Sequence, residues 1–256
     1  MAYTTINKST EHFNTKLYVG NGGTNAITGV GHQPDMVWLK NRTDGDGHKL
    51  FDSVRGALKV IEPNDSATES TYANSLASFD SDGFTIGSTA DINESSDNFV
   101  SWNWKAGTTS GLSGGTITPT AYSINASSGV GIYKYTGNST SGATIAHGLG
   151  KIPTSIWVKR LDSAKEWQIY HQAMGNGKWI ELTSGTPQTG TSRWNDTSPT
   201  STLFYLGNDS DVNYNGASYV AYVFCDVTGF SKMGSYTGNA NNDGVFVYTG
   251  FKPSWL

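Results

Sequence analysis

A ten-residue motif that occurs twice and begins a third time constrains the fold of this chain most strongly. Residues 31–40 read GHQPDMVWLK, residues 150–159 read GKIPTSIWVK, and residues 250–256 read GFKPSWL. In each copy a Gly-x-x-Pro turn precedes apolar residues that, in the two complete copies, alternate with polar or aromatic ones. Glycine permits a positive φ, proline excludes helix, and alternation is typical of a strand. The repeated unit is therefore predicted to be a β building block.

Alternation divides the strand of this motif into two faces. We expect one face to form the core and the other to form a surface or an interface. A tryptophan on the second face in both copies leaves a large apolar patch open unless it is covered. We therefore expect Trp38 and Trp157 to pack against a neighbouring repeat or subunit, with lysine stems beside them. The first face holds Val37, Leu39, Ile156 and Val158, and the second holds Trp38, Lys40, Trp157 and Lys159.

The rest of the chain repeats the same stretches in the same order, which indicates an internal duplication. A third unit opens with GSYTGN at residues 234–239 and reaches Leu256 in the middle of a predicted strand. A strand without a partner in its own unit is not stable alone. We expect that the natural chain continues or that this piece completes a neighbour. The corresponding stretches are 17–21 and 133–138, 59–62 and 178–182, 84–87 and 204–207, and 100–104 and 220–224.

The repeats predict an all-β fold of tandem antiparallel β-sandwiches, jelly-roll-like, with about six strands in each repeat. The segment before the first repeat has too few apolar anchors, Tyr3, Ile6 and Phe13, to close a core. We expect it to be an arm that docks on another protein. The predicted segments are an N-terminal arm (1–16), repeat 1 (17–107), a Thr-, Ser- and Gly-rich linker (108–129), repeat 2 (130–229) and the start of an incomplete third repeat (230–256).

Composition excludes several classes of function. Charged residues make up 15% of the chain and the net charge is −4, so no basic field is available for nucleic acid. No run approaches the roughly 20 apolar residues that span a bilayer, and we expect no membrane insertion. The start lacks the pattern of a secretory signal, so we expect synthesis in a cytoplasm. The single cysteine, Cys225, lies in an apolar run and is predicted to be a buried small hydrophobe.

No catalytic set, metal site or cofactor is predicted from the polar residues. The histidines lack metal-ligand spacing, and His32 and His147 are expected to decorate turns. The loops at 80–83 and 208–213 are rich in oxygen ligands but lack the acidic set of an EF-hand. A glycan-cleaving enzyme needs paired carboxylates. Repeat 2 has Asp162, Glu166 and Glu181, but repeat 1 has Thr43, Gly47 and Glu62 at the corresponding positions, which favours solvated loop charge.

Four aromatic residues distinguish repeat 2 from repeat 1 and are candidates for carbohydrate binding, because aromatic faces stack on sugar rings. Buried packing or a subunit interface is the alternative explanation. The four are Trp167, Trp179, Trp194 and Tyr205. The candidate interface residues are Trp38, Trp157, Tyr3, Ile6 and Phe13.

Several stretches together resemble a repeat domain of marine tailed bacteriophages, found in virion structural and tail-fibre-like proteins of phages that infect cyanobacteria and marine alphaproteobacteria. They are MAYTTI at 1–6, FDSVRG at 51–56, FDSDGF at 79–84, GFSKMGSYTG at 229–238 and the paired YTGN and Gly-x-x-Pro motifs. The resemblance covers nearly the whole chain from Leu17 onward and carries no catalytic motif.

This resemblance implies a virion structural protein, made in the host cytoplasm and located on the tail or capsid surface. It favours a tail fibre or fibre-like appendage for attachment and host-surface recognition. A capsid-surface decoration or head-fibre protein and a polysaccharide-degrading tailspike are the alternatives. The implied partners are other virion proteins, bound through the N-terminal arm, a host-surface glycan, and further copies of the chain in a homo-oligomer, with a trimer favoured.

Overall fold

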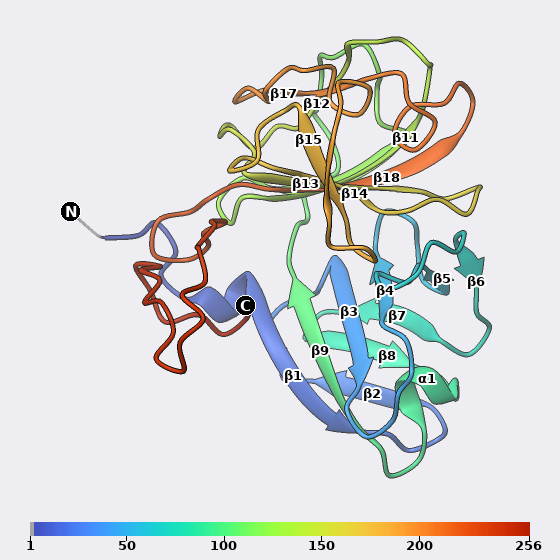
Figure 1. The fold of residues 1–256 in the computed structure, drawn as a ribbon. Coiled ribbons are helices and arrows are strands. Elements are labelled where there is room, and N and C mark those ends of the chain that lie inside the picture. Colours follow the sequence, from blue (N-terminus) through green and yellow to red (C-terminus); the bar gives the residue numbers. More distant parts are fainter. Residues whose placement is uncertain (1–2) are drawn as a thin grey trace.

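Antiparallel strands make up most of the regular structure in the computed structural model, which describes residues 3–256 (Figure 1). Within these residues the helical elements are one 3-10 turn, η1 (Ser9–Glu11), and one short helix, α1 (Ala90–Asn93). The predicted all-β class is confirmed. Neither helix is long and apolar enough to cross a membrane.

The first repeat contains two facing sheets and a short strand pair. Its larger sheet has the order β1-β9-β3-β4, its smaller sheet has the order β2-β8-β7, and β5 pairs with β6. Several strands are too short to leave an alternating pattern, which is why the repeat has more strands than the sequence predicted. The bounds are β1 Phe13–Val19, β2 Asn25–Thr28, β3 Met36–Asn41, β4 Lys49–Asp52, β5 Lys59–Val60, β6 Ser70–Thr71, β7 Leu76–Asp80, β8 Gly83–Ile86 and β9 Asn98–Trp104.

The second repeat follows the same plan with a larger main sheet. Its main sheet has the order β10-β11-β18-β13-β14-β15-β16, and β12 pairs with β17. The bounds are β10 Ala121–Asn125, β11 Val130–Thr136, β12 Ala143–Ala146, β13 Ser155–Arg160, β14 Gln168–His171, β15 Lys178–Glu181, β16 Pro187–Thr189, β17 Leu203–Leu206 and β18 Ser218–Phe224.

The strands of the repeated motif, β3 and β13, occupy equivalent central positions and keep the same register. Trp38 of β3 lies opposite Trp102 of β9, and Trp157 of β13 lies opposite Tyr222 of β18. The turns between strands also match. A Cβ added at Gly87 or at Gly207 would collide with a backbone carbonyl, so both copies need glycine where β8 and β17 end. The duplication therefore extends from sequence to strand order and pairing.

The two faces of β3 and β13 separate as alternation predicts. Val37 and Leu39 are fully buried between the sheets of the first repeat, and Ile156 and Val158 are buried in the core of the second. The opposite faces carry Trp38 and Trp157, which belong to a third apolar cluster. Each repeat thus has its own core, and the outer face of each main sheet is also apolar.

The structure changes two of the expected segment boundaries. β1 begins at Phe13, inside the expected arm, and pairs with β9 along its whole length. Ile6 is buried, so this part of the arm packs on its own chain. The expected linker contains β10, which pairs with β11 and extends the main sheet. This strand has only five residues, 121–125, so the alternation of Tyr122 and Ile124 was too short to reveal it in the sequence.

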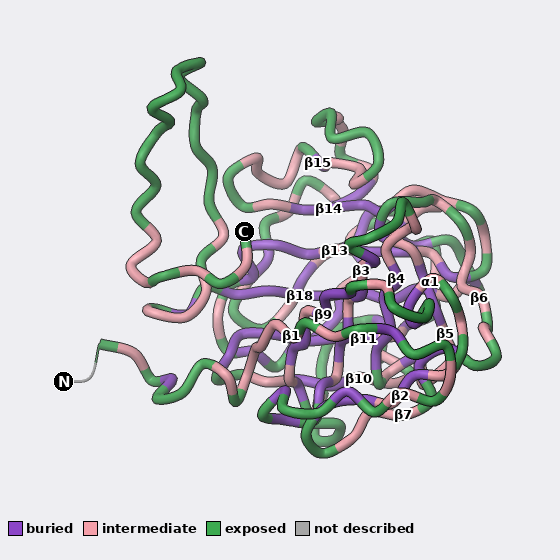
Figure 2. Tube along the Cα trace, turned by 90° about the horizontal axis from the view of Figure 1, so that it is seen from below, coloured by how far each residue is buried: buried purple, intermediate pink, exposed green. Residues whose placement is uncertain are grey.

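The third unit forms no strand among its described residues, 230–256. Its central part projects from the body as an exposed loop with two long arms (Figure 2). Strands need a hydrogen-bonded neighbour, and among the described residues this stretch has only the isolated bridge of Ser231 with Val227. The strand predicted for GFKPSWL is therefore wrong for this structure, although Trp255 packs against the body.

Candidate functional site

The main sheets of the two repeats pack against each other through their outer faces, and this interface is the candidate functional site (Figure 1). Its buried apolar residues come from β3, β4 and β9 on one side and from β11 and β18, with flanking loops, on the other. They are Met36, Leu50, Ile61 and Trp104 of the first repeat, and Val130, Ile132, Leu161, Trp167, Val220, Tyr222 and Phe224 of the second.

The two equivalent tryptophans of the repeated motif contact each other at this interface. The ring centroids of Trp38 and Trp157 lie 6.1 Å apart with an interplanar angle of 82°, an edge-to-face arrangement. Trp157 also packs on Phe224 at 5.1 Å. Each indole nitrogen has a partner, because Trp38 Nε1 donates to His48 Nδ1 at 2.8 Å and Trp157 Nε1 donates to Ser155 Oγ at 2.9 Å. The rings therefore join neighbouring repeats of one chain.

The third unit adds a tryptophan to the same cluster. The ring of Trp255 lies 5.5 Å from that of Trp104 and 6.4 Å from that of Trp38. Phe13 packs on Trp104 from the other side, at 4.9 Å. All three units of the chain thus meet in one aromatic cluster. Of the remaining predicted interface residues, Ile6 is buried, and the exposed Tyr3 donates its hydroxyl to Gly250 O at 3.1 Å.

A buried ion pair lies beneath the aromatic cluster and ties the repeats together. Arg55 Nε donates to Asp52 Oδ2 at 2.5 Å, and both side chains are fully buried. Tyr222 of the second repeat donates its hydroxyl to the same carboxylate oxygen at 2.5 Å. Burial raises the pKa of Tyr222 well above its ordinary value, so the hydroxyl remains a donor. A carboxylate of one repeat is therefore neutralised by its own arginine and hydrogen-bonded by the other repeat.

Three further hydrogen bonds cross the interface, and each is accepted by a backbone carbonyl. Trp167 Nε1 donates to Glu62 O at 2.9 Å, and Glu69 N donates to Leu161 O at 3.0 Å. Lys159 Nζ donates to Ser66 O at 3.1 Å and also to two carbonyls of its own repeat. Burial lowers the pKa of Lys159 to about 8, while nearby carboxylates act in the opposite direction. The lysine predicted to lie beside the tryptophan thus bridges the two repeats.

The predicted carbohydrate-binding aromatics do not form a surface platform. Trp167, Trp179 and Trp194 are buried, with exposures of 0%, 9% and 1%, and Tyr205 is partly buried on β17. Trp167 stacks on Tyr222 at 6.0 Å, inside the interface between the repeats. This corrects the carbohydrate-binding prediction for the three tryptophans, because a buried ring face is already covered by protein atoms. Their polar neighbours in sequence concealed this burial.

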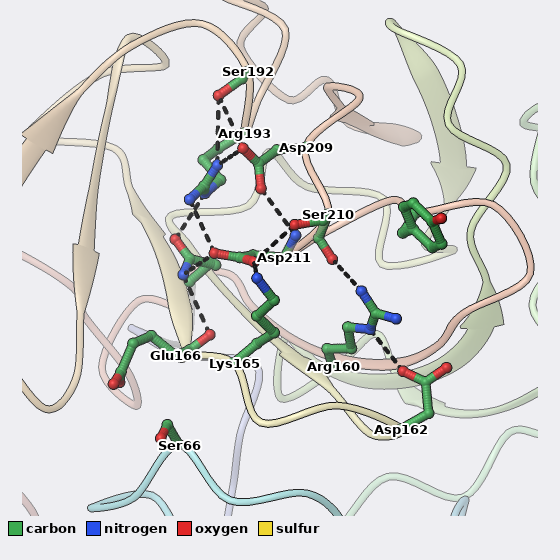
Figure 3. Close-up of polar contacts among 12 residues, drawn as sticks. Ser66, Arg160, Asp162, Lys165, Glu166, Ser192, Arg193, Asp209, Ser210 and Asp211 are labelled. Carbon is green, nitrogen blue, oxygen red and sulfur yellow. Dashed lines mark hydrogen bonds and ion pairs between the residues drawn. The ribbon is translucent and has the colours of Figure 1, made fainter.

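A charged cluster on the second repeat contains most of the carboxylates considered for glycan cleavage (Figure 3). Arg193 forms ion pairs with Asp209 and Asp211, the latter at 3.0 Å, and packs over the Trp179 ring at 4.7 Å. Lys165 Nζ also lies 3.2 Å from Asp211 Oδ1. These contacts hold the loop before β18 against two other loops, the one between β16 and β17 through Arg193 and the one between β13 and β14 through Lys165.

The carboxylates predicted for glycan cleavage also have partners within their own repeat: Asp162 forms an ion pair, and Glu166 and Glu181 accept hydrogen bonds from hydroxyl groups. Asp162 Oδ1 accepts from Arg160 Nε at 2.7 Å (Figure 3). Glu166 Oε2 accepts from Thr183 Oγ1 at 2.5 Å. Glu181 accepts a long hydrogen bond from Ser184 at 3.5 Å. The sequence did not reveal the partner Arg193, because ion pairs between loops leave no local pattern. The arrangement fits loop stabilisation better than acid–base chemistry.

The remaining candidate groups have structural partners. Asp82 accepts hydrogen bonds from the backbone amides of Gly29 and Gly31, and these bonds lower the pKa of its carboxyl group. His32 and His147 are buried, contrary to the expectation that they decorate turns. Cys225 is buried as predicted, and burial raises its pKa to about 12. No cluster of three or more His, Cys, Asp or Glu residues suited to a metal ion occurs within residues 3–256.

A shallow groove of about 560 Å³ lies where the repeats meet beside β10. Asp35 is its one carboxylate, and it bridges the repeats. Its oxygens accept from Ser53 Oγ at 2.7 Å, Ser123 Oγ at 2.9 Å and Ala106 N at 2.8 Å. With these donors in place, Asp35 fixes the angle between the repeats and is not a free base.

Comparisons with known proteins identify a family and no individual relative. No curated protein and no solved structure matches the chain. The model of a domain of unknown function, DUF7483, matches residues 8–256, which includes both repeats and the third unit. The match begins before β1 and treats the repeats as parts of one domain, in agreement with their shared interface. The chain therefore belongs to the DUF7483 family.

Proposed function

We propose that this chain is a structural protein of a tailed-phage virion, most consistent with a tail fibre or fibre-like appendage built from tandem, jelly-roll-like β-sandwiches. Its work is assembly and contact with a host surface. The proposal joins the motif resemblance described above to the organisation of the interface between the repeats. The observation that carries it is the contact of Trp38 with Trp157.

That contact supports a structural role in an array of units, because equivalent residues of successive units meet each other. An array in which each unit packs on its neighbours is stabilised along its length. Trp255, from the third unit, joins the same cluster, so the interface involves every unit of the chain. The buried pair of Asp52 and Arg55 resists sliding, since separating the sheets would expose a charge that has lost its partner Tyr222.

Localisation on intact particles tests the proposal. Antibodies raised against the purified chain are applied to virions of the phage that encodes it and are located by electron microscopy. Label on the tail or its fibres is the expected result. Label on the capsid surface would favour the decoration alternative, and particles without label would overturn a virion role. Release of sugars from host glycan by the purified chain would favour the tailspike alternative.

A further inference from the structure

The outer edge of β1 lacks the strand that covers the equivalent edge in the second repeat. β10 pairs antiparallel with β11 over its whole length, from Ala121 opposite Lys134 to Asn125 opposite Val130. β1 occupies the position of β11 in its own sheet, but it is an edge strand in the sheet order of the described residues. Repeat 2 therefore shows what a closed edge looks like, and repeat 1 has the same edge open.

The register of β1 identifies the backbone groups that this edge presents. The carbonyl of His12 accepts from the amide of Lys105, and the amide of Gly20 donates to the carbonyl of Asp97. The backbone amides and carbonyls of even-numbered residues in β1 therefore point toward β9. The peptide groups of Phe13, Thr15 and Leu17 consequently face outward. The side chains of Leu17 and Val19 are 58% and 57% exposed, which makes the edge apolar as well as unpaired. Such an edge is a template for another strand.

The projecting part of the third unit has the properties of a strand without a neighbour. Val245, Phe246, Val247 and Tyr248 are consecutive and are 44%, 86%, 47% and 68% exposed. Valine and aromatic residues favour extended structure. The base of the segment is fixed to its own chain, since Lys232 Nζ donates to Tyr248 O at 2.9 Å. The segment itself projects away from the body (Figure 2).

We propose that residues 245–248 of one copy add as an antiparallel edge strand to β1 of a second copy. The spacing of Phe246 and Tyr248 matches that of Tyr122 and Ile124 in β10, which pack on the core of the second repeat. Main-chain hydrogen bonds to the outward peptide groups give affinity, and alternate side chains cover the exposed Leu17. β10 thus serves as the template for the intermolecular strand.

Donor and acceptor lie at different places on the chain, so this contact is heterologous. A heterologous contact that does not close into a ring gives an open-ended array. The inference rests on the proposed function and deepens it, since it names how copies of a fibre protein join. The occupant is a second copy because the donor segment projects away from its own body.

The N-terminal segment is the competing occupant of the β1 edge. Residues 2–7 read AYTTIN, close to the AYSIN of β10. Within the described residues Tyr3 instead contacts Gly250, and Ile6 N donates to Thr4 Oγ1, which bends the segment away from an extended strand. Hydrogen bonds of Glu11 N and His12 N close the turn of η1 between this segment and β1. This occupant gives a different cross-link and is therefore an outcome of the test.

Disulfide cross-linking tests the inference with the full chain. Leu17→Cys and Val245→Cys are prepared as separate variants, mixed and oxidised, while the buried Cys225 does not compete. Val245 takes the place of Ala121 in β10, which lies opposite Lys134, the residue equivalent to Leu17. A mixed dimer is expected between the two variants.

Ile152→Cys is the matched control, because Ile152 is 52% exposed and belongs neither to β1 nor to residues 245–248. The proposal is overturned if the donor-segment variant cross-links to Ile152→Cys as readily as to Leu17→Cys. It is also overturned if no dimer forms with Leu17→Cys.

Light scattering supplies the second measurement. The unmodified chain is expected to associate with increasing concentration, and L17K/V19K is expected to weaken that association at least tenfold without loss of β-rich circular dichroism. A chain that is monomeric at all concentrations overturns strand addition, as does a disulfide within one chain between Tyr3→Cys and Leu17→Cys. Either result overturns strand addition but does not affect antibody labelling of virions. If the cross-link forms but virions carry no label, only the proposed function is overturned.

Discussion

The two repeats share the parts that hold each sandwich together. Tyr18 stacks on Phe99 and Tyr135 stacks on Tyr219, in both cases at 5.1 Å and nearly parallel. The hydroxyl of Tyr18 donates to Ile92 O and that of Tyr135 to Val212 O, both at 2.7 Å. These pairs lie at equivalent positions, so the duplication has preserved the packing of a tyrosine on the main sheet and its tie to the loop below.

The repeats differ where they meet each other and at their edges. β4 ends in Asp52, which is buried in the interface, whereas β14 ends in the partly buried His171. Lys159 reaches across to the first repeat, whereas Lys40 donates to carbonyls of its own loop at Asn41, Asp44 and Asp46. The sandwich is therefore the duplicated unit, while the contacts between sandwiches are built from positions that have diverged.

Removing both central tryptophans should give the largest effect. Burial of such a ring contributes about 2–3 kcal/mol, so W38S/W157S should lower the free energy of unfolding by about 4–6 kcal/mol. Because the rings contact each other in one chain, stability rather than subunit association is expected to change. Urea denaturation followed by circular dichroism measures this. The control Tyr214→Ser, at a residue 53% exposed, should change little, and a loss in the double variant no larger than the control's would refute the role of the cluster.

Replacing the buried Asp52 should show most clearly how the two repeats differ in stability. Asp52→Ala leaves Arg55 buried without its partner and should cost about 3–5 kcal/mol of unfolding free energy. His171→Ala, at the equivalent position of the second repeat, should cost less than about 1 kcal/mol, as is usual away from buried networks. Denaturant midpoints of the two variants provide the comparison. Equal losses would mean that the ion pair contributes no more than an ordinary strand end.

A buried asparagine in each repeat should show equal effects. Asn93 Nδ2 donates to Gly87 O at 2.8 Å, and Asn213 Nδ2 donates to Gly207 O at 2.8 Å. Each side chain also accepts from a backbone amide near the start of its repeat, that of Asn21 or Asn138. Replacing either asparagine by alanine leaves buried groups unpaired and should cost about 2–3 kcal/mol.

The two asparagine variants are compared by thermal and urea unfolding. The exposed Asn215→Ala is the matched control and should leave both transitions unchanged. A large difference between the Asn93 and Asn213 variants would show that the repeats have diverged in their cores as well as at their interface.

The smallest expected effect concerns pH. Burial lowers the pKa of Lys159 from its usual 10.5 to about 8, so the unfolded chain binds more protons between these values. Stability should therefore rise with pH between 8 and 10.5, by about 1–2 kcal/mol over the two pH units that are measured. Lys159→Met should lack this rise. Unfolding measured at pH 7.5 and 9.5 in both proteins checks it, and a parallel pH dependence would contradict a perturbed lysine.

The sequence predicted those features that follow from local periodicity. The alternation of Val37, Trp38 and Leu39 predicted a strand with one core face and one covered face, because side chains alternate across a strand whatever it packs against. The repeated Gly-x-x-Pro turns predicted the duplication, and Cys225 within an apolar run predicted its own burial. The alternation and the apolar run depend on residues only a few positions apart, and the duplication was visible because such a local motif recurs in the sequence.

Contacts between distant residues were beyond the reach of such patterns. The interface prediction named Trp38 and Trp157 but left open whether a repeat or a subunit would cover them. Trp167 was a candidate for sugar binding until the fold placed it on Tyr222. β10 was hidden in an expected linker, because its five residues were too few to reveal an alternation.

The all-β class, the repeated unit and the division of its central strand into two faces all follow from the sequence without the structure. The folded structure adds that those faces meet each other, that Asp52 lies beside Tyr222 at a separation of 170 residues, and that no strand among residues 3–256 pairs with the outer edge of β1. The physical reason is that strand periodicity is a local property of the backbone. Burial, ion pairing and edge closure depend on which surfaces approach each other after folding.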